Sequence, residues 1–403
     1  MSVLSGKKIL LGITAGIAAY KTAHLVRLFI KAGAQIRVVM TPASKDFVTP
    51  LTLSTLSKNQ VHSTFYEKSE ENELWNNHVE LGLWADYFVI APTTANTLSK
   101  MAKGTCDNLL MAVYLSAKCK VYFAPSMDLD MYKHPATLDN IAKLRKFGNV
   151  MIPAEHGELA SGLVGEGRMA EPEAILSFIE NDILSQLPLR GKKILITAGP
   201  TYEAIDPVRF IGNYSSGKMG FAIANEAAQL GAKVILISGP SGERIANESI
   251  ERIDVVSADE MYKAAHAYFD TVDIAILAAA VADYKPEEVS VHKIKKIDTR
   301  MSIRLVPTPD ILASLGNEKK DQFLVGFALE TDNEMENAKA KLKRKNLDMI
   351  VLNSLRDAGA GFQKNTNKIT VIHKDGAVNE YDLKSKTEVA GDIFTEILNQ
   401  IHA

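Results

Sequence analysis

Nearly the same segment occurs twice in the chain, and this repeat constrains the fold more than any other feature of the sequence. GKKILLGITAG spans residues 6–16, and GKKILITAG spans residues 191–199. Each copy is a short apolar run that ends at glycine, the pattern of a buried strand followed by a turn. The second copy lies in mid-chain, where no signal peptide acts, so the first copy is also interpreted as a strand.

The first half continues as a β-α-β unit. Leu25, Leu28 and Phe29 fall on one face of the predicted helix, and Gly33 is its stop signal. Parallel strands need such a crossover helix, so the pattern predicts a parallel sheet. The predicted elements are a helix over 17–33 and strands over 7–14, 35–41, 87–91 and 120–125.

The second half repeats this scheme and adds a hairpin that turns on Asp375 and Gly376. Its predicted elements are a helix over 215–232, strands over 192–199, 233–238 and 323–328, a buried strand running into a loop over 273–284, and a hairpin over 367–383. Pro188 and Gly191 mark the junction. The sequence therefore predicts an α/β protein of two consecutive doubly wound, Rossmann-like domains with mostly parallel sheets, at 1–188 and 189–403.

Charge and cysteine content exclude several classes of protein. The 46 basic and 48 acidic residues nearly balance, which argues against a nucleic-acid-binding protein or one that binds anionic membranes. Cys106 and Cys119 are too few for a zinc ribbon or a disulfide scaffold, and a reducing cytoplasm is expected. The longest unbroken apolar run, 274–282, is too short to span a bilayer.

Ligands of open parallel sheets bind at the carboxyl ends of the strands. After the first strand, Thr14, Gly16 and the Ile17 N–H suit a mononucleotide phosphate, although Gly16 alone also fits a tight turn. After the strand at 87–91, the uncharged donors Thr93, Thr94 and Asn96 suit a flavin or sugar-phosphate edge. Plain helix capping is the alternative for these three residues.

Two further features of the first half are candidates. His78 lies in a polar segment before an apolar strand, and we interpret it as either a structural histidine or a general base. The segment 161–167 has three glycines in seven residues, which is typical of either a plain connector or a mobile lid.

In the second half, residues 212–219 resemble a phosphate-binding P-loop, but Met219 stands where a hydroxyl is needed for magnesium. No strand is predicted directly before this segment, so we reject a Walker A motif. The helix start still suits an anion. Two lysine clusters lie downstream, either as solvated surface or as contacts of a polyphosphate with Mg²⁺: His292, Lys293, Lys295 and Lys296, and the helical pair Lys341 and Lys345.

The chain resembles the CoaBC family of coenzyme A biosynthesis proteins, in which a phosphopantothenoylcysteine decarboxylase is fused to a phosphopantothenate–cysteine ligase. The resemblance covers essentially all 403 residues and rests on long, unusual segments. These are GITAGIAAYK (12–21), NHVELGLWAD (77–86), APTTAN (91–96), CDNLL (106–110), APSMDLDMY (124–132), GEGRM (165–169), TAGPTYEAIDPVRFIGNYSSGKMG (197–220), AAAVADY (278–284), PTPDIL (307–312) and KNLD (345–348).

For the first half, the resemblance implies an FMN-dependent decarboxylase with His78 as its catalytic histidine. A flavin supplies the electron sink that loss of CO₂ from a cysteine carboxylate requires. Two positions depart from the family pattern: Asp128 replaces an asparagine, and Ser161 replaces the lid cysteine that acts as proton donor. The implied flavin contacts are Thr14, Gly16, Ile17, Thr41, Thr93, Thr94, Ala95 and Asn96.

For the second half, the resemblance implies a CTP-dependent ligase that works through an acyl-cytidylate and needs Mg²⁺. Asn213 matches the residue that holds this intermediate, and Arg209 matches a substrate-binding arginine. Lysines beside a leaving pyrophosphate would stabilise its growing charge. The implied nucleotide contacts are Leu277, Ala278, Ala279, Asp283, Lys293, Pro309, Asp310, Ile311, Leu312, Phe327, Lys341 and Lys345.

The leading hypothesis is therefore an enzyme that makes 4′-phosphopantetheine from 4′-phosphopantothenate, cysteine and CTP. The alternative keeps the ligase active, with a flavin half that is impaired or only binds flavin. A nicotinamide dehydrogenase is disfavoured by the incomplete dinucleotide fingerprint. Fold analogy suggests a homo-oligomer, with trimeric decarboxylase halves and dimeric ligase halves.

Overall fold

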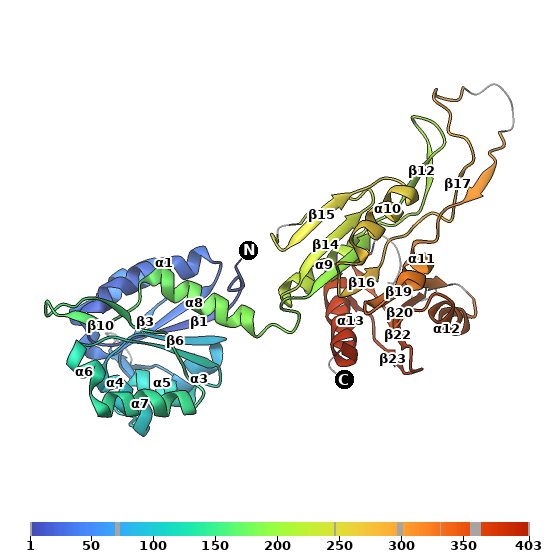
Figure 1. The fold of residues 1–403 in the computed structure, drawn as a ribbon. Coiled ribbons are helices and arrows are strands. Elements are labelled where there is room, and N and C mark those ends of the chain that lie inside the picture. The colour runs from blue at the N-terminus through green and yellow to red at the C-terminus, as the bar shows by residue number, and fades with distance from the viewer. Residues whose placement is uncertain are drawn as a thin grey trace. The chain divides into compact units, whose positions relative to one another are not determined.

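The computed structural model describes residues 2–68, 73–245, 247–295, 301–330, 332–354 and 364–401. The chain forms two compact units, residues 1–185 and 186–403 (Figure 1). Lys296, in one of the predicted lysine clusters, lies outside the described residues. Within the described chain, no helix combines the length and apolarity needed to cross a membrane.

The first unit is built on a six-stranded parallel sheet of order β3-β2-β1-β6-β7-β8. Strand β1 shows why it is central: Ile9, Leu11 and Ile13 belong to one core cluster, and Leu10 faces the other. The sheet strands are β1 (Lys8–Ile13), β2 (Gln35–Met40), β3 (Val61–His62), β6 (Tyr87–Thr93), β7 (Lys120–Pro125) and β8 (Val150–Met151).

Helices cover both faces of this sheet, and two antiparallel hairpins complete the unit (Figure 1). The helices are η1 (Ile17–Lys21), α1 (Thr22–Lys31), η2 (Pro42–Asp46), α2 (Pro50–Ser57), α3 (His78–Trp84), α4 (Ala95–Lys103), α5 (Leu109–Ser116), α6 (Leu129–Lys133), α7 (Pro135–Lys146) and α8 (Pro172–Ser185). The hairpins are β4 (Tyr66–Lys68) with β5 (Glu73–Trp75), and β9 (Glu155–Glu158) with β10 (Val164–Arg168).

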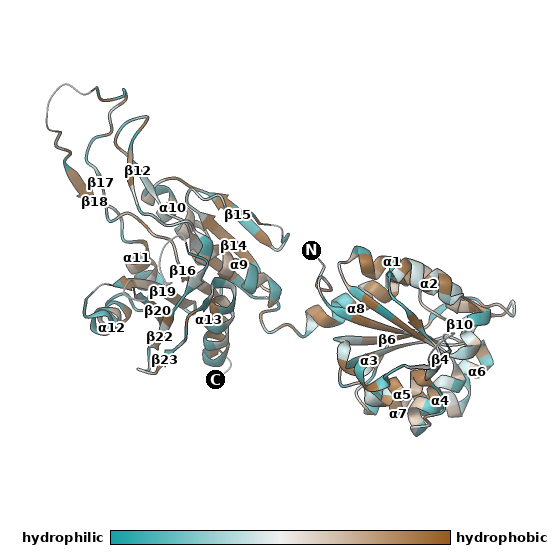
Figure 2. Ribbon diagram, turned by 180° about the vertical axis from the view of Figure 1, so that it is seen from behind, coloured by the Kyte–Doolittle hydropathy of each residue, from teal (hydrophilic) through white to brown (hydrophobic). Residues whose placement is uncertain are grey.

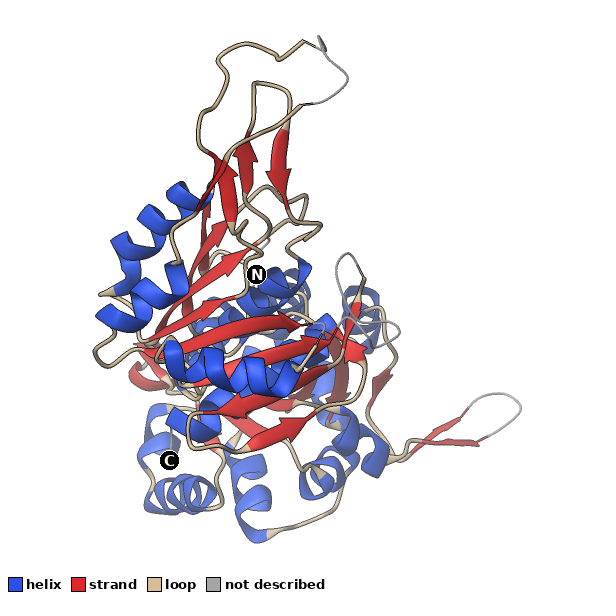
Figure 3. Ribbon diagram, turned by 90° about the vertical axis from the view of Figure 1, so that its right-hand side faces the viewer, coloured by secondary structure: helices blue, strands red, loops and turns tan. Residues whose placement is uncertain are grey.

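The second unit repeats the design with eight strands in the order β15-β14-β11-β16-β19-β20-β22-β23, parallel up to β20 and antiparallel after it. The apolar strands lie between helices in both units (Figures 2 and 3). The sheet strands are β11 (Lys193–Ala198), β14 (Lys233–Ser238), β15 (Ile250–Asp254), β16 (Ile274–Leu277), β19 (Phe323–Glu330), β20 (Met349–Ser354), β22 (Ile369–His373) and β23 (Val378–Glu380).

The remaining elements of the second unit are five helices and three two-stranded ribbons within its described residues. The β12–β13 and β17–β18 ribbons lie side by side beyond the sheet (Figure 1). The helices are α9 (Lys218–Gln229), α10 (Ala258–Phe269), α11 (Ile311–Glu318), α12 (Glu334–Arg344) and α13 (Lys386–Ile401). The ribbons are β12 (Tyr202–Ala204) with β13 (Phe210–Gly212), β17 (Tyr284–Pro286) with β18 (Leu305–Pro307), and β21 (Thr366–Asn367) with β24 (Lys384–Ser385).

The predicted fold class is confirmed, and several predicted bounds are wrong. Residues 17–21 form a 3₁₀ turn before α1, and most of the segment 77–86 is helix α3. The segment 273–284 is confirmed as a strand that runs into a loop: the strand ends at Leu277, and the Ala279 N–H donates to the Thr197 hydroxyl at 3.2 Å. A strand does directly precede the P-loop-like segment, although β13 belongs to a side ribbon and not to the central sheet.

Candidate active sites

The first unit has a cavity of about 510 Å³ where the strand order reverses between β1 and β6. Among the predicted flavin contacts, Thr41, Thr94, Ala95 and Asn96 line it. The other lining residues are Ala15, Pro42, Ala43, Thr97, Lys100, Asn108, Ser126, Met127 and Met131. The structure thus brings together residues that follow four different strands of the sheet, β1, β2, β6 and β7.

Thr14 and Thr93 are not in this lining but hold its walls in place. The Thr14 hydroxyl donates to the Pro92 carbonyl at 2.7 Å and accepts from the Thr94 N–H at 3.2 Å. The Thr93 hydroxyl donates to the Ile90 carbonyl at 2.7 Å. Both threonines are buried; Thr14 joins the loops after β1 and β6, whereas Thr93 bonds within β6 itself.

Gly16 and Ile17 also lie outside the lining. A Cβ on Gly16 would sit 3.3 Å from the Thr94 methyl group, tighter than ordinary contact, so glycine allows the two loops to approach closely. The Ile17 side chain is 60% exposed.

Two features of the cavity fit a polar, anionic ligand. The Thr41 hydroxyl oxygen is buried and has no hydrogen-bond partner within the described residues. Helix α4 begins after Thr94, and no side chain from the described residues caps that end. The first N–H groups of a helix have no partner inside the helix, and they attract phosphate. The predicted FMN contacts at Thr41, Thr94 and Ala95 therefore have the chemistry that a phosphorylated cofactor needs.

His78 is the first residue of α3, and it is not in the cavity lining. Its ring lies edge-on to Phe65 and Trp75, with centroids 6.2 Å apart in both cases. Its Nδ1 is buried without a hydrogen-bond partner in the described part of the chain. The histidine is therefore half-buried against aromatic rings, with one ring nitrogen unused.

Asp128 and Ser161 contact each other. The Ser161 hydroxyl donates to Asp128 Oδ1 at 3.0 Å, and the same oxygen accepts from the Leu129 N–H at 2.8 Å as α6 begins. The Met127 N–H donates to the Gly167 carbonyl at 3.0 Å, which fixes the β9–β10 hairpin beside the cavity. The glycine-rich segment is thus a hairpin that packs next to a cavity-lining residue.

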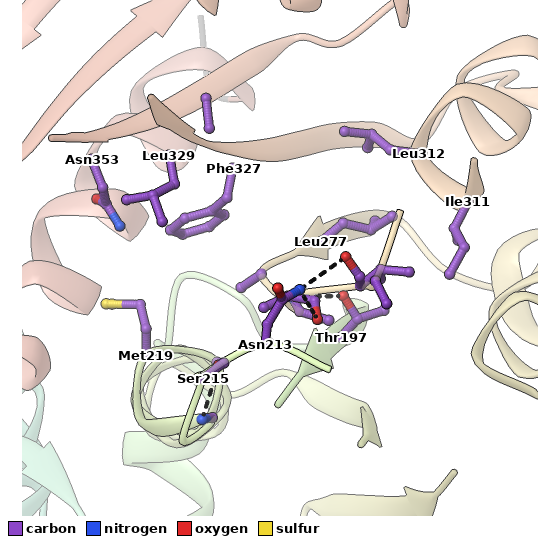
Figure 4. Close-up of a pocket in the computed structure, with 18 of the residues that line it drawn as sticks. Thr197, Asn213, Ser215, Met219, Leu277, Ile311, Leu312, Phe327, Leu329 and Asn353 are labelled. Atoms are coloured by element: carbon purple, nitrogen blue, oxygen red, sulfur yellow. Dashed lines mark hydrogen bonds between the residues drawn. The ribbon is translucent and has the colours of Figure 1, made fainter. Parts of the chain in front are cut away.

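The second unit has a cavity of about 580 Å³ at the carboxyl ends of β11, β16 and β19 (Figure 4). Twelve of the fourteen residues predicted for this half line it. They are Asn213, Leu277, Ala278, Ala279, Asp283, Pro309, Asp310, Ile311, Leu312, Phe327, Lys341 and Lys345.

Asn213 is held against the loop that follows β16. Its Nδ2 donates to the carbonyls of Ala280 at 3.0 Å and Val281 at 3.1 Å. The side chain reaches across from the β13 end toward this loop (Figure 4). Because both amide hydrogens are directed to these carbonyls, Asn213 fixes the position of the backbone that lines the middle of the cavity.

The two predicted helical lysines are placed by different partners. Lys341 Nζ donates to the Phe327 carbonyl at 2.8 Å, and Lys345 forms an ion pair with Asp310 at 2.8 Å. Burial, and then the charge of Lys345, lowers the pKa of Lys341. Burial alone would raise the pKa of Asp310, but the hydrogen bonds from Lys345 and the Ala313 N–H hold this pKa below its usual value. This end of the cavity is therefore a positively charged wall formed by two lysines, of which Lys345 is ion-paired with Asp310.

Arg209 and Lys293 are the two predicted residues outside the cavity lining. Arg209 Nε donates to Asp206 at 3.0 Å, and its NH2 donates to the Ile294 carbonyl at 2.7 Å. Asp206 is buried and also accepts from the Val208 N–H at 2.8 Å. Arg209 thus organises the turn between β12 and β13 in this structure, and Lys293 is exposed nearby.

The structure adds lining residues that the sequence did not single out as binding residues. Lys386 and Asn367 come from the last part of the chain, and no motif distinguishes them from other lysines and asparagines. Ser215 and Ser216 lie in the P-loop-like segment, and this segment was the sequence feature that could have identified them as lining residues. The additional lining residues include Thr197, Ser215, Ser216, Lys218, Met219, Thr308, Leu329, Asn353, Asn367 and Lys386.

Each of the two units matches the model of a known protein family. A family model described as Flavoprotein matches residues 2–184. A model described as DNA/pantothenate metabolism flavoprotein C-terminal domain matches residues 189–401. A crystal structure of the C-terminal domain of a coenzyme A biosynthesis bifunctional protein CoaBC shares 44% identity, covering 54% of this chain and 99% of its own, with a TM-score of 0.47.

Two curated relatives span most of the chain. The coenzyme A biosynthesis bifunctional protein CoaBC of Bacillus subtilis (strain 168) is 44% identical, covering 98% of this chain and 97% of its own length. A protein named cysteine/cysteine sulfinic acid decarboxylase, from an unknown prokaryotic organism, is 55% identical over 88% of this chain and 100% of its own. The matches to both units and to the full-length relatives agree: the chain belongs to the CoaBC family of bifunctional coenzyme A biosynthesis proteins.

Proposed function

We propose that the chain makes 4′-phosphopantetheine in two steps. The second unit joins 4′-phosphopantothenate to cysteine at the expense of CTP, and the first unit decarboxylates the product with FMN. The observation that carries this proposal is the second-unit cavity, whose lining combines Asn213, the acid-paired Lys345 and the half-buried Lys341 at the ends of parallel strands.

In the ligation, the substrate carboxylate attacks the α-phosphorus of CTP, and the bond to the β-phosphate breaks to release pyrophosphate. The amine of cysteine then attacks the acyl carbon, and CMP leaves as the amine loses a proton. Lys341 and Lys345 stabilise the charge that grows on the leaving phosphates. Asp283 and Asp310 also line the cavity, and Mg²⁺ binds through one or two carboxylates together with phosphate oxygens.

In the first unit, FMN would lie at Thr41, Thr94, Ala95 and Asn96. When bound, it supplies a reversible oxidation of the cysteine thiol, which gives the carboxylate's electrons an acceptor as CO₂ leaves. Support comes from the unpartnered Thr41 hydroxyl and the uncapped start of α4 in the described structure. His78 is proposed as the base that removes a substrate proton, and its Nδ1 has no hydrogen-bond partner within the described residues.

We also propose that the chain works as a homo-oligomer. The ribbons of the second unit expose large apolar side chains that a monomer would leave in water. Val291 is 82% exposed, Val208 60% and Phe210 52%. A Val291→Asp variant should elute later than the wild type in size-exclusion chromatography, whereas Val79→Asp, which also changes an exposed valine of the described chain, controls for the added charge. An unchanged elution volume for Val291→Asp would contradict a contact at the ribbons.

A second candidate function for the first unit is decarboxylation of cysteine or cysteine sulfinic acid with a free amino group. The observation that favours it is Asp128, a carboxylate beside the cavity where the family pattern has a neutral amide. A free amino acid carries an ammonium group at neutral pH, which a carboxylate attracts. The nitrogen of phosphopantothenoylcysteine is an amide and carries no charge. The 55% identical relative has this activity in its name.

The two functions are separated by substrate competition. Purified protein with FMN is given phosphopantothenoylcysteine, cysteine or cysteine sulfinic acid anaerobically, and CO₂ release is followed for each. The main proposal predicts the highest kcat/KM for phosphopantothenoylcysteine, with phosphopantetheine as product. Higher kcat/KM for the free amino acids would favour the second candidate. Pyrophosphate release that depends on both phosphopantothenate and CTP tests the ligase independently.

A further inference from the structure

The second-unit cavity has a second end, opposite the wall formed by Lys341, Lys345 and Asp310. In Figure 4, Met219, Leu329 and Asn353 lie toward this end, and Ile311 and Leu312 lie toward the other. The lining here comes from the start of α9, from β19 and β20, from β21 and from the first residue of α13. The proposed roles of Lys341 and Lys345 leave this end without a function.

Lys386 is the central residue of this end. It is 9% exposed, it lines the cavity, and its Nζ has no hydrogen bond or ion pair with any described residue. By contrast, Lys341 donates to a carbonyl and Lys345 is paired with Asp310. The side chain is buried as a whole, but its Nζ is not fully enclosed, so the unpartnered ammonium opens into the cavity, where a bound anion can form a charge-assisted hydrogen bond with it.

Lys218 adds a second positive charge. It is the first residue of α9, lines the cavity, and donates to Asn365 Oδ1 at 2.7 Å. Burial and then the charge of Lys218 lower the pKa of Lys386, and Glu243 opposes this only in part. The two acidic residues of the cavity lining, Asp283 and Asp310, instead face Lys341.

Neutral hydrogen-bond donors surround the two lysines. Asn367 is buried, and its Nδ2 donates to Asn353 Oδ1 at 3.1 Å, which leaves the Asn353 NH₂ to face the cavity. Gly217, with φ 84°, is the N-cap of α9, and having no side chain it supplies no cap to the first N–H groups of the helix. Helix starts of this kind attract anions.

We propose that this end of the cavity is a phosphate-binding subsite, with Lys386 as its principal cation and Lys218, Asn353 and the start of α9 as its other donors. The ligand is the phosphate ester of the carboxylic acid substrate, since the leaving phosphates of the nucleotide are already assigned to Lys341 and Lys345 at the other end. Only the identity of the substrate that carries this phosphate rests on the proposed function. The subsite itself rests on Lys386 and its surroundings.

The test compares wild-type protein with Lys386→Met, Lys386→Arg and Lys233→Met. Lys233 is an exposed lysine at the start of β14 and serves as the matched control. Calorimetric titration of the full chain with inorganic pyrophosphate, and separately with inorganic phosphate, measures the subsite without any turnover. Loss of one charge-assisted hydrogen bond predicts at least about tenfold weaker binding in Lys386→Met. Lys386→Arg should retain most of the affinity, and Lys233→Met all of it.

Steady-state kinetics of ligation then test the assignment to the acid. A raised KM for phosphopantothenate alone in Lys386→Met is expected, and a raised KM for CTP alone would overturn this assignment. Equal affinities of wild type and Lys386→Met for both inorganic anions, with the variant folded by thermal unfolding, would overturn the proposal. If the wild type binds the anions through Lys386 but does not ligate these substrates, the proposed function fails and the subsite stands.

Discussion

The Ser161 hydroxyl donates a hydrogen bond to Asp128 Oδ1 at 3.0 Å, so the two positions of the first unit at which the resemblance predicts departures from the family pattern contact each other. One lies at the start of α6, and the other lies in the turn of the β9–β10 hairpin. A hydroxyl is a stronger hydrogen-bond donor than a thiol. The Asp128 carboxylate therefore receives a stronger hydrogen bond from Ser161 than it would from a cysteine at this position. The two departures are therefore best understood as one change.

Reversing this change tests its effect on the flavin half. We expect Asp128→Asn with Ser161→Cys together to raise kcat/KM for phosphopantothenoylcysteine by about tenfold, since a charge facing the substrate carboxylate is removed and a better acid is supplied. Anaerobic assays with product mass measure it. Each single variant is the control for the other. A double variant no better than the wild type would mean that Asp128 and Ser161 do not limit this reaction.

Asn213 should be essential to ligation and irrelevant to decarboxylation. Asn213→Asp replaces the two donated hydrogen bonds by a carboxylate facing the Ala280 and Val281 carbonyls. We expect a loss in ligase kcat of about a hundredfold or more, comparable to the removal of one transition-state donor. Pyrophosphate release measures ligation, and CO₂ release from phosphopantothenoylcysteine serves as the internal control. Equal losses in both assays would contradict a local role.

The pH dependence of nucleotide binding should reflect Lys341. Burial and Lys345 lower its pKa from the ordinary lysine value, so Lys341 loses its charge at a lower pH than a surface lysine does. The KM for CTP should therefore rise on the alkaline side below the ordinary lysine pKa. Arginine keeps its charge throughout this range, so Lys341→Arg should shift the rise to higher pH. Identical pH profiles for the two proteins would exclude Lys341 as the titrating group.

Asp206 should stabilise the β12–β13 turn in a pH-dependent way. Hydrogen bonds from Arg209, and from the backbone N–H groups of Val208 and Ile294, hold the pKa of Asp206 well below its usual range. A depressed carboxyl contributes stability above its unfolded pKa, and this contribution is lost as the pH falls through the folded value. Asp206→Asn should therefore lower Tm most at pH 7, and its difference from the wild type should shrink toward pH 3. A constant difference across this range would show that the charge is not involved.

The sequence predicts elements best where one strong pattern decides them. The strand at 233–238 has the same bounds as β14, because an apolar run there ends in polar residues and glycine. The hairpin turn at Asp375 and Gly376 is also confirmed, with Gly376 at φ 94°. The segment 273–284 is confirmed as a strand that runs into a loop, but local apolarity does not reveal that the strand ends at Leu277, where the following backbone bonds to Thr197, 82 residues earlier in the chain.

The candidate sites were also predictable from the sequence only in part. Topology alone places the carboxyl ends of β11, β16 and β19 at one edge, and Leu277 and Phe327, which the resemblance implied as nucleotide contacts, line the cavity there. The pair Lys341 and Lys345 shares a helix face and does line the cavity. Lys386 carries no signal in the sequence, because its burial depends on the packing of α13 against α9. Arg209 matched a binding position, yet its charge is taken up by Asp206.

The central claim is the two-step conversion, and one anaerobic reaction tests it most directly. The protein, reconstituted with FMN, is given 4′-phosphopantothenate, cysteine, CTP and Mg²⁺, and CO₂, pyrophosphate and product masses are measured together. We predict one pyrophosphate and one CO₂ for each 4′-phosphopantetheine formed. Release of CO₂ from cysteine without pyrophosphate or phosphopantetheine would contradict the account.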